Sequence, residues 1–486
     1  MKISAPRLWV VSLSTAFLTA CVAPPPQPEN IDIGVPEQLP VVTSSASKTA
    51  SDHSTPLLEP SEAWQQFFTD PQLQTLIQSA LTFNSDLKAA TARVAEARAV
   101  YGIREAERLP QLGAQAEGER GRVPADLSVS QQAVTRGQYQ AGLGVSAFEL
   151  DFWGRVSSLS AAALAQYLAT EQARASFEIS LIAMTANAYL ESVALAERID
   201  LARKTVATRT ESQRIMQARV DVGSASDLDL RSVQSLLLSA RSELASLERE
   251  KAQNTALIQQ LTGHSEPVVV DENTRLAEQR LDRIIPAQLP STVLLQRPDI
   301  RAAEQGLVAA RANVDAARAA FFPRITLTGF AGTASAGLDG LFRGGSGAWS
   351  FMPQISLPIF DGGARESNLA LAEARKHLAV ADYESAIRAA FKEVADALAA
   401  HHWLAEQEKQ QARLVASEKD RARLANLRYE QGSSEYLDVL DAQRSLFSAE
   451  QMLLQLQQIR LSNMVGLYRA LGGGASQIED NKGITL

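Results

Sequence analysis

One stretch of the sequence carries charged side chains that are spaced so that they could act together on a dissolved ion. Leu437, Asp441 and Arg444 recur at intervals of four and three residues, so a helix places them on one face. Val439 and Ala442 lie roughly opposite that face. A carboxylate and a guanidinium one turn apart form a solvated surface pair or, in a symmetric assembly, rings of fixed charge that select ions and set an aperture. The residues alone leave both interpretations open.

The remaining residue types argue against catalysis. The sequence has no Walker-type phosphate loop, no Gly-x-Ser-x-Gly nucleophile turn and no His-Glu-x-x-His zinc motif. Its five histidines are scattered, and the adjacent His401 and His402 point to different sides of a helix. The formal net charge of -8 gives no basic surface for a nucleic-acid backbone. We therefore expect no enzymatic activity, no metal ion, no cofactor and no nucleic-acid partner.

The only cysteine, Cys21, has a chemistry of its own. It follows Leu18-Thr19-Ala20 at the end of an apolar run that is too short to span a membrane and is typical of a secretory signal. This motif resembles a bacterial lipobox, in which the signal is removed before the cysteine and the thiol is acylated. Val22 follows instead of an aspartate, which favours sorting to the outer membrane. Residues 1–20 are predicted as the signal peptide and residues 21–60, rich in Pro, Ser and Thr, as a lipid-anchored extended linker.

The elements that position the charged residues belong to an internal repeat with a spacing of about 210 residues. Val222-Gly223-Ser224 in the first copy corresponds to Gln431-Gly432-Ser433 in the second, and Leu228-Asp229 corresponds to Leu437-Asp438. Each copy is predicted to contain a helix, a β-hairpin, a long helix and a returning helix. The copies are assigned to residues 61–263 and 291–473, with a linker at 264–290 and a tail at 474–486.

Long helices are the main feature of each copy. Proline-free helical patterns run from about 155 to 220 and from about 364 to 430. At 1.5 Å per residue, about 65 residues extend for ~100 Å, which no globular domain needs. The returning helices carry the apolar spacing of paired helices at Leu230, Val233, Leu237, Ala240, Leu244 and Leu247, and at Val439, Ala442, Leu446, Ala449, Leu453 and Leu456. Each copy should therefore project a helical hairpin with its tip near Gly223 or Gly432, and Ser226 with Asp229 forms a capping arrangement just after the first tip.

Alternating segments precede each long helix. In the second copy they comprise Ile325, Leu327, Gly329 and Ala331, then Trp349, Phe351, Ile355, Leu357 and Ile359. In the first copy Tyr139, Ala141, Leu143, Val145 and Ala147 alternate after a weaker strand near 111–123, which itself follows a helix from Asp70-Pro71 to about Arg108. Such alternation fits strands that separate lipid from water, and also a half-buried hairpin of a soluble sheet.

Four strands cannot span a membrane alone, because open sheet edges leave backbone groups unpaired in hydrocarbon at several kcal/mol each. Assembly of three chains would supply twelve strands, an even number within the range of closed outer-membrane barrels. The same symmetry would gather the helices into a tube.

Nearly the whole mature chain resembles the TolC-like outer membrane efflux proteins, of the lipid-anchored OprM or NodT type. The resemblance rests on the lipobox and on Leu109-Pro110, Phe322-Pro323, Phe360-Asp361-Gly362-Gly363, Tyr429-Glu430-Gln431-Gly432 and Asp438-Val439-Leu440-Asp441-Ala442-Gln443-Arg444. It implies an α+β membrane protein and a homotrimer: a 12-stranded β-barrel in the outer membrane, continuous with a coiled-coil α-barrel in the periplasm. The family has no enzymatic activity.

The resemblance also implies a periplasmic gate at the hairpin tips. Asp441 and Arg444 would form charged rings beside Leu437, and Asp438 would add to an acidic rim. Tyr429 and Asp229 would form a hydrogen-bond latch between neighbouring hairpins. Ser232 and Ser235 stand in the first copy where the second has Asp441 and Arg444, so only one hairpin would carry the constriction. Ser434 departs from the family, because some members have an arginine there that locks the closed state.

The implied partners are a periplasmic membrane-fusion adaptor protein, an inner-membrane pump, an RND-type pump being favoured, and outer-membrane lipid. The expected function is a passive exit duct for drugs or other toxic small molecules. Two alternatives stay open: the outer-membrane conduit of a type I protein secretion system, and a lipid-anchored coiled-coil tether that conducts nothing.

Overall fold

The computed structural model describes residues 36, 38, 62–264, 266, 274–281, 283 and 290–474. The predicted signal peptide at 1–20, the predicted lipidation site Cys21 and the tail after Gly474 lie outside the described residues, as does almost all of the predicted linker at 21–60.

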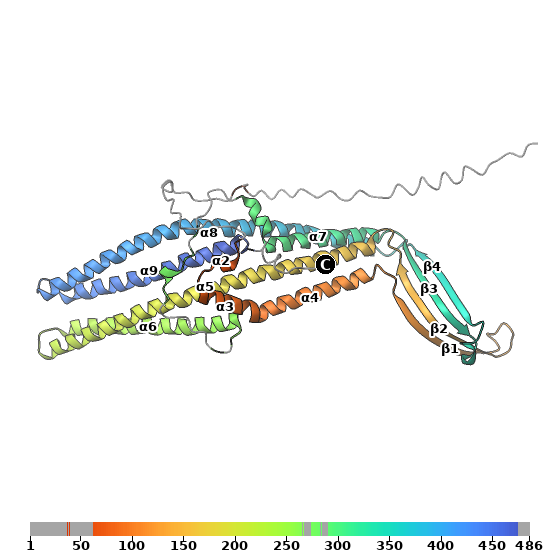
Figure 1. Ribbon diagram of the computed structural model, residues 1–486, viewed down its shortest axis with the longest axis horizontal. Coiled ribbons are helices and arrows are strands. Elements are labelled where there is room, and N and C mark those ends of the chain that lie inside the picture. Colours follow the sequence, from red (N-terminus) through yellow and green to blue (C-terminus); the bar gives the residue numbers. More distant parts are fainter. Residues whose placement is uncertain are drawn as a thin grey trace, which may run out of the picture. The chain divides into compact units, whose positions relative to one another are not determined.

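The described elements follow the order expected for a duplicated chain (Figure 1). A short helix, α2 (Trp64–Phe67), comes first. The first copy then contains α3 (Pro71–Phe83), α4 (Ser85–Ala106), β1 (Leu112–Val123), β2 (Val134–Glu149), α5 (Arg155–Asp221) and α6 (Asp227–Thr262). After the 3-10 helices η1 (Leu276–Glu278) and η2 (Ser291–Gln296), the second contains α7 (Pro298–Ala319), β3 (Arg324–Ser335), η3 (Leu338–Gly340), β4 (Gly347–Ser356), α8 (Ala364–Glu430) and α9 (Tyr436–Ala470).

The helix predicted to run without interruption from Asp70 to about Arg108 is broken at Asn84. The Asn84 side chain caps α4 by accepting hydrogen bonds from two of its backbone amides, and its Nδ2 donates to the Leu261 carbonyl at 3.0 Å. Arg297 holds the corresponding place before α7 and donates to the Ala470 carbonyl at 2.7 Å. Each break thus supplies a side chain that satisfies a carbonyl at the end of a returning helix, where helices lack partners of their own.

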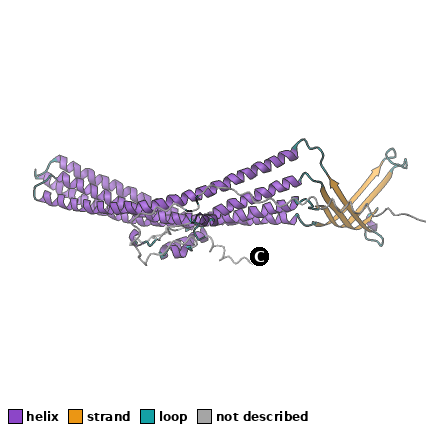
Figure 2. Cartoon of the chain, turned by 90° about the horizontal axis from the view of Figure 1, so that it is seen from above, coloured by secondary structure: helices purple, strands orange, loops and turns teal. Residues whose placement is uncertain are grey.

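The four strands form one antiparallel sheet in the order β1-β2-β3-β4. Strands β2 and β3 pair with each other, so the hairpins of the two copies join in a single sheet at one end of the helices (Figure 2). A bulge between Val145 and Phe148, with Ala147 at a φ of 52°, interrupts the alternation predicted there. The alternation predicted through Leu357 and Ile359 ends with β4, because Pro358 has no N–H for the ladder.

The register gives the sheet two faces of different chemistry, because cross-strand partners lie on the same side. The apolar face comprises Leu112, Ala114, Ala116, Gly118, Tyr139, Ala141, Leu143, Val145, Phe148, Ile325, Leu327, Gly329, Ala331, Trp349, Phe351, Pro353 and Ile355. The polar face includes Gln115, Glu117, Glu119, Gln138, Gln140, Thr326, Thr328, Ser350 and Gln354, and its apolar exceptions are Val123, Val134, Phe330, Ala334, Ala348 and Met352. Trp349 is 80% exposed and Phe351 63%, so within the single chain the apolar face is uncovered.

The helices pack around the two long ones. Helix α5 contacts α3, α4, α6, α7 and α9, and α8 contacts α7 and α9. Part of α5 is long and apolar enough to cross a membrane by composition, but 72% of that stretch is buried inside the protein. It is therefore a core helix. Most positions of the predicted seams are buried, among them Leu237 and Leu247 of α6 and Val439 and Ala442 of α9.

The two hairpin tips have the same backbone geometry. Gly223 and Gly432 adopt φ values of 74° and 70°, a conformation that glycine reaches without strain. In each tip the serine that follows the glycine donates its backbone N–H to the carbonyl five residues earlier, at 2.8 Å for Ser224 and 2.9 Å for Ser433. These bonds end α5 and α8 in the same way. The following turns reverse the chain, so that α6 and α9 run back along the long helices (Figure 1).

Candidate functional site at the helical hairpins

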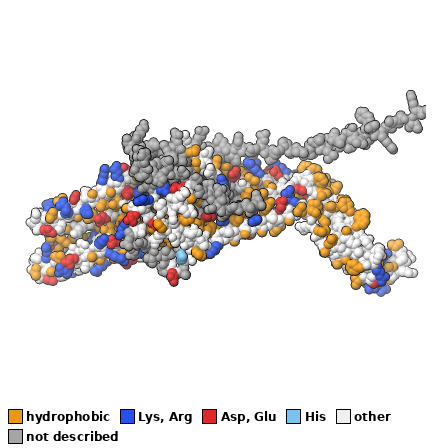
Figure 3. All heavy atoms as spheres, in the orientation of Figure 1, with side chains coloured by type: hydrophobic (Ala, Val, Ile, Leu, Met, Phe, Trp, Pro, Cys, Tyr) orange, Lys and Arg blue, Asp and Glu red, His pale blue; other side chains and the backbone are white. Residues whose placement is uncertain are grey.

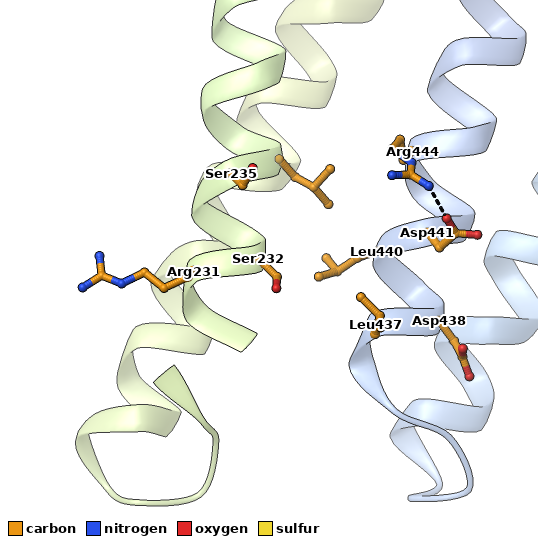
Figure 4. Close-up of a pocket in the computed structure, with 9 residues that line it drawn as sticks. Arg231, Ser232, Ser235, Leu437, Asp438, Leu440, Asp441 and Arg444 are labelled. Carbon is orange, nitrogen blue, oxygen red and sulfur yellow. Dashed lines mark hydrogen bonds and ion pairs between the residues drawn. The ribbon is translucent and has the colours of Figure 1, made fainter. Parts of the chain in front are cut away.

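A cleft separates the two hairpins close to their tips (Figure 4). It lies between α6 and α9 and has a volume of about 620 Å³. Its lining consists of Arg231, Ser232, Ser235, Leu236, Leu437, Asp438, Leu440, Asp441 and Arg444. Four of the predicted gate residues therefore lie together.

The two walls of the cleft are equivalent positions of the repeat. Ser232 and Ser235 project from α6, and Asp441 and Arg444, their counterparts, project from α9 (Figure 4). The comparison of the two repeats predicted that these positions are equivalent, but it did not predict that they line opposite walls of one cleft. As a result, the equivalent positions carry hydroxyl groups on the α6 wall and fixed charges on the α9 wall, while Arg231 adds a charge to the α6 side.

The Asp441 carboxylate has two guanidinium partners. Its Oδ1 accepts a hydrogen bond from Arg444 at 2.5 Å, and its Oδ2 accepts one from Arg421 of α8, also at 2.5 Å. The bond from Arg421 is the largest cause that lowers the pKa of Asp441 below its ordinary value, and Arg444 adds to the effect. The carboxylate is therefore ionised at neutral pH and joins α8 to α9.

Arg421 is a functional candidate that the sequence reasoning missed. It also contacts Glu418 at 3.2 Å and Ser445 at 3.4 Å, so it lies at the centre of a polar cluster. A signal existed, because Arg421 and Asp441 are equally far along the chain from Gln431, just before the tip. Residues equidistant from the turn of an antiparallel hairpin face each other.

Leu437 and Asp438 lie in the first turn of α9. The Leu437 side chain is 58% exposed, which suits a residue that narrows an opening in an assembly. Asp438 places a negative charge at the helix N-terminus, where the backbone dipole favours it. Glu435, the N-cap residue, makes no side-chain capping bond, so this start is less firmly held than that of α6.

Tyr429 links the second hairpin to the first, but through a partner that was not predicted. Its hydroxyl is hydrogen-bonded to the Arg219 guanidinium of α5, which also lies 5.4 Å above the Tyr429 ring. The ring is 4.8 Å from that of Tyr436. Within the chain the Asp229 carboxylate is engaged elsewhere, accepting hydrogen bonds from the backbone and hydroxyl of Ser226 in the expected capping box. The latch expected between Tyr429 and Asp229 of neighbouring hairpins stays a prediction.

An apolar cluster lies between the hairpins at the same level. Met216, Leu230, Val233 and Leu440 are buried together, with Tyr436 packed against them. The polar contacts of the tip thus rest on a hydrophobic contact between α5, α6 and α9. Among the described residues no group of three or more His, Cys, Asp or Glu side chains could hold a metal ion. The arrangement can present charge and exchange salt-bridge partners, and it offers no nucleophile paired with a base.

Comparison with known proteins agrees with this architecture. The model of the family described as outer membrane efflux protein matches residues 76–264 and 289–473, which cover most of the first copy of the repeat and all of the second. The chain is 46% identical over 412 residues to the solvent efflux pump outer membrane protein SrpC of Pseudomonas putida, covering 85% of this chain and 87% of that protein.

Two further proteins extend the comparison. The outer membrane protein OprJ of Pseudomonas aeruginosa is 43% identical over 411 residues, covering 85% of this chain and 86% of OprJ. The crystal structure of the open state of the Neisseria gonorrhoeae MtrE outer membrane channel superimposes with a TM-score of 0.81 at 38% identity, covering 93% of this chain and 98% of that one. Sequence and fold lead to one assignment: the chain belongs to the outer membrane efflux protein family.

Proposed function

We propose that three copies of this chain form a passive exit duct for small toxic molecules, which an inner-membrane pump of the RND type and a periplasmic adaptor protein deliver. As a member of its family the chain is an outer-membrane component of an efflux system and extends into the periplasm. The proposal adds the trimer, the pump class, the adaptor and the absence of catalysis.

The observation that carries the proposal is the pair of open edges on a two-faced sheet. Within the part of the chain that the structure describes, strands β1 and β4 each pair with one other strand, so each presents a row of backbone groups without a strand partner. In a membrane such groups cost several kcal/mol each. Pairing β1 of one copy with β4 of the next removes both edges, and three four-stranded sheets then close into a 12-stranded β-barrel. The apolar face would meet lipid and the polar face water.

The same symmetry would turn the cleft residues into a gate. Asp441 and Arg444 of three copies would form the charged rings, with Leu437 narrowing the opening and Asp438 at its rim. The Arg421 to Asp441 and Arg219 to Tyr429 contacts would hold the hairpins in the narrow arrangement. Opening would require both contacts to break or to exchange partners.

The names of the relatives support small apolar cargo. SrpC is named for solvent efflux, and the related TtgI of Pseudomonas putida for toluene efflux. The exposed apolar face of the sheet is of no use to a coiled-coil tether, so the non-conducting alternative has less support. Acylation of Cys21 completes the proposal, although this residue lies outside the described part of the chain.

Reconstitution tests the proposal. We expect purified protein to run as a trimer in native mass spectrometry and to conduct ions in a planar lipid bilayer. Stable single subunits in detergent, with their secondary structure intact, would show that the edges need no partner and would contradict the trimer. Trimers that leave the bilayer silent would instead favour a tether.

A further inference from the structure

The strand β1 ends with two exposed arginines that lie beyond its apolar residues. Arg120 pairs in register with Gly137 of β2, and Arg122 pairs with Thr135. Side chains two residues apart on a strand share a face, so both arginines are on the same side as Ala114 and the rest of the apolar face.

These arginines are not neutralised by the described part of the chain. Neither Arg120 nor Arg122 makes an ion pair or a hydrogen bond through its side chain with a described residue. The glutamates of β1, Glu117 and Glu119, belong to the polar face on the other side of the strand. Opposite the arginines on β2 stand Gly137 and Thr135, which are too small to cover a guanidinium.

Assembly brings no neutralising strand. In the proposed trimer the edge of β1 meets β4 of the neighbouring chain, and β4 (Gly347–Ser356) contains no acidic residue. No strand of the neighbouring chain would therefore bring a carboxylate beside the two guanidinium groups. A charge in that position is stable only next to water or an anionic partner.

The arginines stand at the boundary of the apolar face. The Tyr139 ring lies over Gly118, since a Cβ built on Gly118 would come within 2.9 Å of it. Tyrosine is typical of the level where hydrocarbon gives way to headgroups. Arg120 lies two residues farther along the strand, about 7 Å beyond that level at the usual rise per residue. Because the strands of membrane barrels are tilted by about 35–45°, the distance along the membrane normal is shorter, and it places Arg120 in the headgroup region that holds the lipid phosphates.

The end of the sheet in question is the one remote from the helices. The β1–β2 turn lies far from α4 and α5 (Figure 1), and basic side chains gather near this end of the sheet (Figure 3). Because the helices extend into the periplasm, the turn belongs to the outer surface. The outer leaflet of bacterial outer membranes is built from a phosphorylated glycolipid, whose phosphates guanidinium groups can bind through paired hydrogen bonds.

We propose that Arg120 and Arg122 form a binding site for the phosphate groups of the outer-leaflet glycolipid. The inference rests on the proposed function, because it needs the apolar face to meet lipid. The site holds a ring of glycolipid around the assembly and fixes the depth of the barrel in the outer leaflet. Direct pairing with arginine does not depend on bridging divalent cations.

Retention of added lipid A by the reconstituted protein tests this site, with Arg136 as a matched control. Arg136 lies near the same end of the sheet, opposite Gly121, but its side chain is on the polar face. The full-length trimer is reconstituted in lipid nanodiscs with bisphosphorylated or dephosphorylated lipid A, and retained glycolipid is measured by mass spectrometry. We expect R120Q/R122Q to retain at least fivefold less bisphosphorylated lipid A than the parent and R136Q to retain as much as the parent.

The other arms separate this inference from the proposed function. Dephosphorylated lipid A should be retained weakly by all forms, and a chelator of divalent cations should leave the parent's retention unchanged. The R120Q/R122Q trimer should keep its native mass and conductance, which shows that it is folded. Equal retention by R120Q/R122Q and the parent, equal loss in R136Q, or loss on chelation would overturn the site while the duct stands. Failure of the parent itself to conduct would instead count against the proposed function.

Discussion

Asn254 and Asn463 make the same hydrogen bond in the two copies of the repeat. The Asn254 Nδ2 donates to the Ala188 carbonyl at 2.8 Å and the Asn463 Nδ2 to the Ala397 carbonyl at 3.0 Å, each reaching 66 residues back along the chain. Both asparagines lie on a returning helix and both acceptors on a long helix. A backbone carbonyl inside a helix already accepts one hydrogen bond, so each asparagine donates to the second lone pair of the oxygen. This bond fixes the axial register of one helix against the other.

Replacing either asparagine by alanine should therefore destabilise the hairpin by a similar amount. The expected loss is about 1 kcal/mol for each variant, since one hydrogen bond disappears and the acceptor keeps its helical partner. Thermal unfolding followed by circular dichroism measures the change. Gln253→Ala is the control, because its side chain only accepts a surface bond from Arg249. A fall in melting temperature for Gln253→Ala as large as that for Asn254→Ala would remove the special role of the buried amide.

The salt bridge between Arg421 and Asp441 predicts the effect of neutralising the cleft. Asp441→Asn should raise single-channel conductance and lower the permeability ratio of cations to anions, because it removes the negative ring charge and loosens α8 from α9. Arg421→Gln should raise conductance without lowering that ratio, because the negative ring charge remains. The rise in conductance in the double variant should be smaller than the sum of the rises in the two single variants, since each substitution removes the same contact.

A nearby charge provides the control for this pair. Asp420 is adjacent to Arg421 in sequence, but it pairs with Arg423 on the exposed surface. Asp420→Asn should leave conductance and selectivity unchanged in bilayer recordings. Fully additive effects of Arg421→Gln and Asp441→Asn would show that the two side chains act independently and that their contact does not hold the hairpins.

The lowered pKa of Asp441 predicts how the gate responds to acid. Because the folded pKa lies below the ordinary carboxyl value, the carboxylate's hold on Arg421 is complete above about pH 4 and is lost only as the pH falls through the lowered pKa. Conductance should therefore be constant from neutral pH down to about pH 4 and should rise below it. Asp441→Asn should abolish the rise. A transition near neutral pH in the parent, unchanged in the variant, would assign the response to another group.

The long-range features of the fold could be predicted from sequence because they depend on patterns that repeat. Two copies of a Gly-Ser tip, after proline-free helices, gave the hairpins, and the positive φ of Gly223 and Gly432 explains why glycine is needed there. The alternation from Ile325 to Ala331 gave a strand with two unlike faces, as the register shows.

The features that could not be predicted depend on single side chains whose partners lie far away in the sequence. Asn84 breaks a helix whose composition favours continuity, because its amide serves both the cap of α4 and the carbonyl of Leu261. Arg219 was missed as the partner of Tyr429 for a related reason: side chains on two separate hairpins have no sequence pattern that relates them. The meeting of Ser232 with Asp441 across the cleft likewise needs the packing of α6 beside α9.

The unexpected partner of Tyr429 gives the prediction that most directly separates two versions of the gate. Tyr429→Phe removes the hydroxyl and keeps the ring against Arg219 and Tyr436, so conductance and cell sensitivity to bulky antibiotics should rise without loss of folding. If the contact within the chain holds the gate, Arg219→Gln should match Tyr429→Phe, and combining them should add little. If Asp229 of a neighbouring copy holds it, Asp229→Asn should match instead, although that change also weakens the capping box with Ser226. Ser226→Ala isolates the side-chain part of the cap, because it removes the hydroxyl and keeps both the Asp229 carboxylate and the backbone N–H that donates to it. Wild-type conductance in Tyr429→Phe, Arg219→Gln and Asp229→Asn alike would show that the tyrosine contributes packing alone.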